Sequence, residues 1–137
     1  MKRLALVTTA ALTLVLVMSV ISAPVAFATP IIHVPLSGNL APNQSNLYGP
    51  YSLNIGSTVH IVLHWTPTTS TLAFGVVPAA STGNIKGCTK TGGSGDCLVT
   101  IQTAGSYYVI VSNKSPNSII VTSYNGYADI DICPPCL

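Results

Sequence analysis

Charged side chains are the scarcest component of this chain, and residues 29–137 contain no Arg and no Glu. The ionised groups left in that range are Lys86, Lys90, Lys114, Asp96, Asp129 and Asp131. Their charges cancel, so the formal net charge of +2 comes from Lys2 and Arg3. A protein that binds nucleic acid needs a basic surface to neutralise phosphates. The composition therefore argues against a nucleic acid as partner.

A helical hydrophobic period is also missing after the first 28 residues, which argues against helical folds. Short runs instead alternate between apolar and polar residues. The clearest run covers residues 57–65, where Val59, Ile61, Leu63 and Trp65 occupy alternate positions and so share one strand face. About eight such runs, separated by turn residues, predict one all-β domain: a jelly-roll-like β-sandwich of short antiparallel strands.

Besides residues 57–65, the expected strands are 31–36, 47–55, 71–77, 97–102, 106–112, 118–124 and 127–132. The first strand is expected at a sheet edge, because Pro35 has no backbone N–H to donate. Residues 37–46 are expected to form a polar connector, and residues 78–95 a loop with at most a short strand near Ile85. Asn125-Gly126 is expected to form a two-residue hairpin, since a type I′ turn needs positive φ at both positions.

One long apolar run is present, at the N-terminus. Met1-Lys2-Arg3 precedes apolar residues 4–21, and Ala26-Phe27-Ala28 follows. This pattern predicts a signal peptide over residues 1–28, cleaved near Thr29. The alternative is an uncleaved anchor, because the run of about 18 residues is near spanning length. We therefore expect a secreted or cell-surface protein with no membrane span after cleavage. Its parts would be the signal (1–28), an N-terminal strand with its connector (29–46) and the sandwich with a Cys-Pro-Pro-Cys tail (47–137).

Two stretches carry a family resemblance. Gly-Ser-Thr-Val-His-Ile-Val-Leu-His-Trp at 56–65 and Ala-Gly-Ser-Tyr-Tyr-Val-Ile-Val-Ser at 104–112 resemble bacterial pre-peptidase C-terminal domains, relatives of the collagen-binding domains of collagenases. The resemblance covers residues 47–132 and implies a jelly-roll module that binds an extracellular polysaccharide or protein. Thr71 and Ala73 stand where that family usually has Asp, so no calcium site is carried over to them.

The cysteines are Cys88, Cys97, Cys133 and Cys136. An even number in a secreted chain predicts disulfides. The preferred pairs are 88–97 and 133–136; the alternatives join the tail to the 88–97 loop or link two chains. Cys133 and Cys136 are disfavoured as a redox dithiol, because no helix is expected there whose N-terminus would lower the pKa of a thiol. The 88/97 spacing also fits a four-Cys zinc site poorly.

Catalytic groups are few. Asp129 and Asp131 share one face of the expected last strand, where they would protect a sheet edge from pairing. No Gly-x-Ser-x-Gly motif frames a serine nucleophile. His60 and His64 lie about 13 Å apart along one strand, too far to hold one metal directly. We therefore expect no enzyme, no cofactor and no metal. Tyr107, Tyr108, His60 and His64 are the candidates for a binding surface.

The first strand suggests a function. Ile31, Ile32, Val34 and Leu36 belong to a segment that could leave its own domain and complete the sheet of a neighbour. The alternative is that this strand folds back into its own sandwich, as sequential strands usually do. The expected function is a secreted, non-enzymatic structural or assembly subunit whose partner is a second copy. The alternative is a binding module for an extracellular polysaccharide or protein.

The low carboxylate content predicts unusual tolerance of acid. Acid unfolds proteins mainly by protonating carboxylates that are paired in the native state, and this chain has only three aspartates. The free energy of unfolding should stay nearly constant from neutral pH to about pH 3. Thermal melts followed by circular dichroism at several pH values would check this. A steep loss of structure near pH 4 would contradict it.

Overall fold

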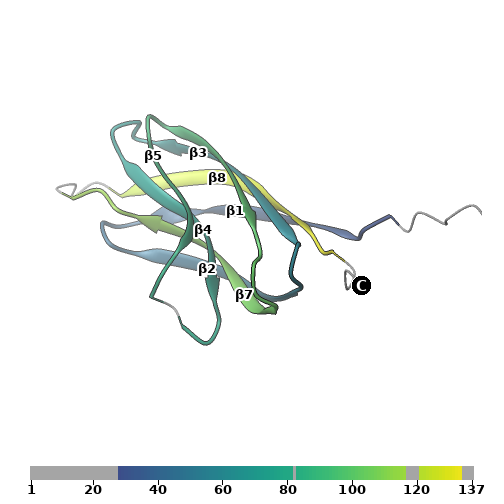
Figure 1. Cartoon of the computed structure of the whole chain (residues 1–137). Helices are drawn as coiled ribbons and strands as arrows, with labels where there is room; N and C mark the ends of the chain where they lie inside the picture. The colour runs from purple at the N-terminus through teal and green to yellow at the C-terminus, as the bar shows by residue number, and fades with distance from the viewer. Residues whose placement is uncertain (1–27, 82, 117–120, 134–137) are drawn as a thin grey trace, which may run out of the picture.

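The computed structural model describes residues 28–81, 83–116 and 121–133, which form eight strands and no helix. The strands are β1 (Ile31–Leu40), β2 (Ser45–Leu53), β3 (Thr58–Thr66), β4 (Thr71–Pro78), β5 (Lys86–Thr91), β6 (Ser94–Thr100), β7 (Gly105–Asn113) and β8 (Thr122–Asp131). Two four-stranded antiparallel sheets, β1-β8-β3-β6 and β2-β7-β4-β5, pack face to face (Figure 1). The all-β sandwich is confirmed.

The strand order is that of one long hairpin rolled up on itself. Strand β4 pairs with β5, β3 with β6, β2 with β7 and β1 with β8. These nested pairs place the tip of the hairpin at β4–β5 and bring the first strand to the last. Eight strands arranged in this way form a jelly roll, as the sequence predicted.

The core lies where the alternating residues predicted it. Strand β3 sits between β8 and β6, and its inward side chains Val59, Ile61, Leu63 and Trp65 are all buried. Strand β4 of the facing sheet contributes Leu72, Phe74 and Val76, which are fully buried. The rings of Trp65 and Phe74 meet edge to face, with centroids 6.1 Å apart.

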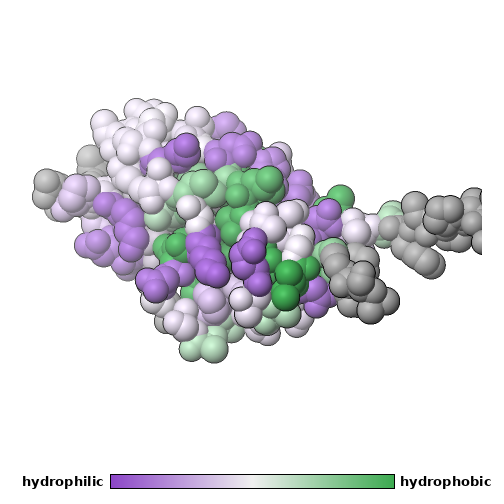
Figure 2. All heavy atoms as spheres, viewed as in Figure 1, coloured by the Kyte–Doolittle hydropathy of each residue, from purple (hydrophilic) through white to green (hydrophobic). Residues whose placement is uncertain are grey.

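The exposed side chains are mostly polar and few of them are charged. Figure 2 shows a patch of apolar residues near the middle of the view, with polar residues around it.

The expected hairpin at Asn125-Gly126 is wrong. Both residues lie inside β8, which runs without a break between β1 and β3. A Cβ on Gly126 would lie 2.0 Å from the carbonyl oxygen of Val62, so glycine permits the close approach of β3 here. The two-residue turn of this fold is instead Gly92-Gly93, between β5 and β6, where φ is 112° and 86°.

The expected connector at 37–46 is also wrong. Strand β1 continues to Leu40 and β2 begins at Ser45, so only residues 41–44 separate them. The polar residues Ser37 and Asn39 face outward and Leu40 is buried. This end of β1 is therefore strand, although its composition is typical of a turn. Within the expected loop at 78–95, the short strand expected near Ile85 is β5, which begins at Lys86 and continues to Thr91. It is largely exposed at a sheet edge and has no apolar pattern.

The predicted signal peptide, apart from Ala28, lies outside the described residues. Within the described ranges, no helix is long and apolar enough to cross a membrane.

Two substitutions on β8 distinguish a continuous strand from a turn. Asn125→Thr should leave the free energy of unfolding within about 0.5 kcal/mol of wild type, because a β-branched residue suits an exposed strand position and resists positive φ. Gly126→Ala should lose about 3 kcal/mol through its clash with β3. Urea titrations would measure both. Gly83→Ala is the matched control, since a Cβ there meets nothing within 4 Å.

Candidate functional site

Strand β1 forms one edge of its sheet and pairs only with β8. The register runs for ten residues, from Ile31 opposite Asp131 to Leu40 opposite Thr122. The candidate exchange residues Val34 and Leu36 are buried in the core, Ile32 packs against it, and Ile31 is 65% exposed. In the single chain, therefore, β1 folds back onto its own sandwich and fills one side of the core.

A four-residue turn at 41–44, hereafter the hinge, joins β1 to β2. Its Asn43 has φ of 62°, the left-handed conformation, which asparagine adopts more often than most residues other than glycine. The backbone N–H of Gln44 donates to Ala41 O at 3.1 Å, and the backbone N–H of Ala41 donates to the side-chain Oε1 of Gln44 at 3.1 Å. The hinge is thus a tight turn with one residue in an uncommon conformation.

Asn113 at the end of β7 anchors this hinge. Its backbone accepts from Asn43 N–H at 2.9 Å and donates to Gln44 O at 2.9 Å. Its fully buried side-chain amide donates to Leu40 O and to Thr122 Oγ1, each at 3.1 Å. Buried amides need such partners, so Asn113 fixes where β1 turns into β2.

A tyrosine pair closes the side between β1 and β2. The hydroxyls of Tyr48 on β2 and Tyr124 on β8 lie 2.6 Å apart. Tyr48 donates to Ser37 O on β1 at 3.0 Å, and the Asn46 amide donates to Tyr124 Oη at 2.7 Å. Burial, and next the hydrogen bond with Tyr48, raise the pKa of Tyr124 well above its ordinary value. The pair therefore holds β1 in place while Tyr124 keeps its proton.

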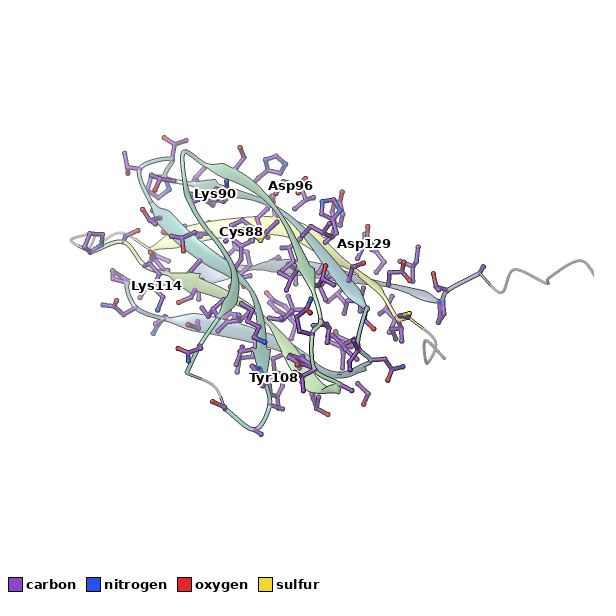
Figure 3. The ribbon with its side chains drawn as sticks, viewed as in Figure 1. Cys88, Lys90, Asp96, Tyr108, Lys114 and Asp129 are labelled. Carbon is purple, nitrogen blue, oxygen red and sulfur yellow. A yellow bond between two sulfur atoms is a disulfide. The ribbon has the colours of Figure 1, made fainter. Side chains whose placement is uncertain are left out.

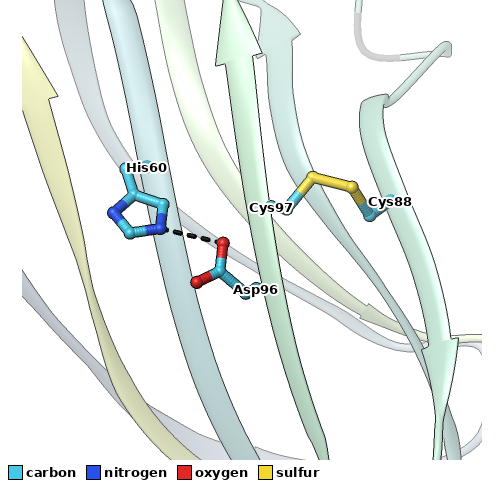
Figure 4. Close-up of polar contacts among 4 residues, drawn as sticks. All are labelled: His60, Cys88, Asp96 and Cys97. Atoms are coloured by element: carbon cyan, nitrogen blue, oxygen red, sulfur yellow. Dashed lines mark hydrogen bonds and ion pairs between the residues drawn. A yellow bond between two sulfur atoms is a disulfide. The ribbon is translucent and has the colours of Figure 1, made fainter.

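The outer face of the β1-β8-β3-β6 sheet gathers histidines and aspartates. His33 on β1 contacts Asp129 on β8, with Nδ1 and Oδ1 2.5 Å apart. His60 on β3 contacts Asp96 on β6, with Nε2 and Oδ1 2.8 Å apart (Figure 4). His64 lies on the same face, and its neighbours in register are polar: Asn125 and Ser94.

The proposed edge role of Asp129 and Asp131 is wrong. Strand β8 lies inside the sheet between β1 and β3, so these aspartates project from its outer face and guard no edge. Asp131 Oδ1 is shielded from solvent and has no hydrogen-bond partner among the described residues. The sequence could not place these groups together, because their neighbours come from strands far apart in the chain.

The four candidates for a binding surface do not form one surface. His60 and His64 share a face of one sheet, as predicted. Tyr108 is half-buried on β7 of the other sheet (Figure 3), whereas Tyr107 is buried and donates to Thr103 O at 2.6 Å. No group of three or more His, Cys, Asp or Glu within the described part of the chain is placed to hold a metal ion.

The disulfide between Cys88 and Cys97 is confirmed. It joins β5 of one sheet to β6 of the other, so it ties the two layers together at one side of the sandwich (Figure 4). Cys133 is also disulfide-bonded. The predicted partner of Cys133, Cys136, lies outside the described residues.

Neither the scan against protein-family models nor the search of curated proteins finds a match to this chain. The likeness to pre-peptidase C-terminal domains therefore depends on the two stretches quoted above.

The raised pKa of Tyr124 predicts loss of stability in base. The unfolded chain releases this proton near pH 10 while the folded chain retains it, so stability is full below pH 10 and falls above it. Tyr124→Phe should cost about 1 kcal/mol at neutral pH and give a flatter profile above pH 10. Urea titrations between pH 7 and 11 would measure this. Tyr127→Phe, on the outer face of the same strand, is the control, and an alkaline profile of Tyr124→Phe as steep as wild type would contradict the assignment.

Proposed function

We propose that this chain is a secreted, non-enzymatic structural subunit that assembles with copies of itself by exchanging strand β1. The observation that carries the proposal is the position of β1. It is an edge strand at the start of the described chain, it pairs only with β8, and it supplies core residues. The Cys88–Cys97 disulfide supports an oxidising, extracellular location.

The core explains why β1 would be replaced and not simply lost. If β1 left its own domain, the cavity that holds Val34, Leu36 and Leu40 would open, and β8 would have an unpaired edge. An exposed apolar edge strand is a template for pairing with another chain. The β1 strand of a second copy has the identical side chains and register, so it fits this site without any new contact.

The hinge supplies the bias toward exchange. Since the contacts of β1 are the same within one chain and between two, the difference in free energy comes mainly from the connection and the protein concentration. A short connection under strain favours exchange. The hinge has four residues, one of them in the left-handed conformation at Asn43. Exchange would let the hinge extend and release that conformation, at the cost of the backbone hydrogen bonds that Asn43 and Gln44 form with Asn113.

Exchange can produce two products. If two copies trade β1 reciprocally, a closed dimer forms; if each copy passes β1 to the next, the contact repeats and a filament grows. Strand addition of the second kind underlies donor-strand complementation in pili. We propose the filament. Each added copy would need only the β1–β8 pairing, so growth requires no chemistry beyond this contact.

An engineered disulfide tests which chain supplies β1. Ser37 and Asn125 are exposed partners in the β1–β8 register, so Ser37→Cys with Asn125→Cys should form a bond across that pair. In assembled protein, β1 exchange predicts that the bond links different chains. Denaturing, non-reducing electrophoresis should then show a ladder of multimers that a reducing agent converts to single chains.

The control pairs two strands that do not exchange. His64→Cys with Ser94→Cys lies in the β3–β6 register and should give only intrachain bonds in the same preparation. Two results would overturn the proposal. One is assembled protein whose Ser37→Cys/Asn125→Cys bonds are all intrachain. The other is uniform monomers by negative-stain microscopy at high concentration.

A further inference from the structure

The sandwich has four sheet edges, and they lie in two pairs. Strands β1 and β6 form the edges of one sheet, and β2 and β5 form those of the other. The Cys88–Cys97 disulfide joins β5 to β6, so these two edges run along the same side of the sandwich (Figure 4). An edge strand has unpaired backbone N–H and C=O groups and can therefore pair with another chain. The β5–β6 side is accordingly a second place where copies of this chain could add to one another.

Two lysines lie on the inward side of the edge strand β5. Lys86 pairs with Val76 of β4, and Lys90 pairs with Leu72. Residues directly opposite in an antiparallel pair share a face, and both β4 partners are fully buried, so the lysine side chains begin inside the sandwich. Both lysines are nevertheless exposed. Their stems therefore run around the edge of β5 and bring the ammonium groups to water.

Gly95 on the neighbouring edge strand β6 leaves room for Lys90. A Cβ at Gly95 would lie 3.2 Å from Cγ of Lys90 and 2.6 Å from the ring of Phe74. The stem of Lys90 therefore passes β6 at a point where that strand has no side chain. Lys86 lies on the other side of Cys88 along β5, so the two lysines flank the disulfide that joins the edges. Figure 3 labels Lys90 and Cys88 on this strand.

Neither ammonium group has a protein partner that would allow it to be buried. Among the described residues, the salt bridges join only histidines to aspartates, and neither lysine side chain makes a hydrogen bond. Water alone therefore solvates these two charges. A strand paired with the free edge of β5 or β6 would lie across the path by which they reach water. Such pairing is strongly unfavourable, because burial of an unpaired ammonium group removes its hydration without replacing it.

We propose that Lys86 and Lys90 block strand addition on the β5–β6 side of the sandwich and so confine assembly to the side that holds β1. Inward-pointing charges are one of the means by which β proteins keep edge strands from pairing. The inference rests on the proposed function only for the place of assembly, since the block itself does not depend on exchange of β1.

The edge that exchange of β1 would expose carries no such block. Strand β8 contains no proline, and none of its inward side chains is charged. Thr122, Tyr124, Ala128 and Ile130 point inward and are buried, whereas the aspartates of β8 project from the outer face. A strand that pairs with this edge therefore buries no charge between the sheets. The two sides of the sandwich differ in this respect, and the difference favours β8 as the edge that accepts a second copy.

The test removes both lysines from a chain in which β1 cannot exchange. The monomer of Ser37→Cys/Asn125→Cys, oxidised at low concentration, keeps β1 in its own sandwich, so any association must use another surface. Lys86→Thr/Lys90→Thr in this locked chain leaves one lysine against three aspartates in residues 29–137, a formal side-chain charge of −2 in place of 0. Added net charge by itself opposes association. The block predicts the reverse: self-association roughly tenfold stronger, or more, than that of the locked parent in sedimentation velocity at pH 7.5, with new hydrogen-exchange protection of β5 or β6 amides.

Two controls separate the edge from the loss of charge. Lys86→Arg/Lys90→Arg keeps a long cationic side chain at both positions and should stay monomeric. Lys114→Thr removes an exposed lysine that directly follows β7, an inner strand, and should also stay monomeric. The block is overturned if the Lys86→Thr/Lys90→Thr chain stays monomeric, if Lys114→Thr associates as strongly, or if the locked parent already associates with protected β5 or β6 amides. None of these results bears on β1 exchange, which is judged from the interchain bonds of the assembled protein.

Discussion

The pairing of the first strand with the last is the interaction on which the structure depends. Strand β8 lies between β1 and β3, and it can form a complete inner strand only when β1 covers its free edge. The same pairing brings Val34 and Leu36 into the core beside Ala128 and Ile130. It joins the two ends of the described chain, from Ile31 opposite Asp131 to Leu40 opposite Thr122, so it is the most non-local strand pairing of the fold.

Local patterns in the sequence were enough to predict the class of fold and its core. The alternation at Val59, Ile61, Leu63 and Trp65 correctly placed a central strand, because one buried face imposes a period of two. The Cys88–Cys97 pair was the preferred pairing in a chain expected to be secreted, although the sequence left the other pairings open. These features depend on residues close together in the chain.

The errors arose where a long-range contact decides the conformation. Asn125-Gly126 has the composition of a turn, but β1 and β3 on either side hold it as strand, and Gly126 serves the close approach to Val62. The histidine–aspartate contacts on the outer face of the β1-β8-β3-β6 sheet escaped prediction for the same reason. His33 and Asp129 are 96 residues apart, and only the strand order brings them into contact. The sequence shows which residues are charged but not which sheet carries them.

The most direct measurement of the central claim is a cryo-electron microscopy reconstruction of the assembled protein, at a resolution that traces residues 41–44. Strand exchange predicts that these residues extend from one sandwich into the next, with β1 beside the β8 of the neighbouring copy. A closed turn that returns β1 to its own sandwich in every subunit would contradict it.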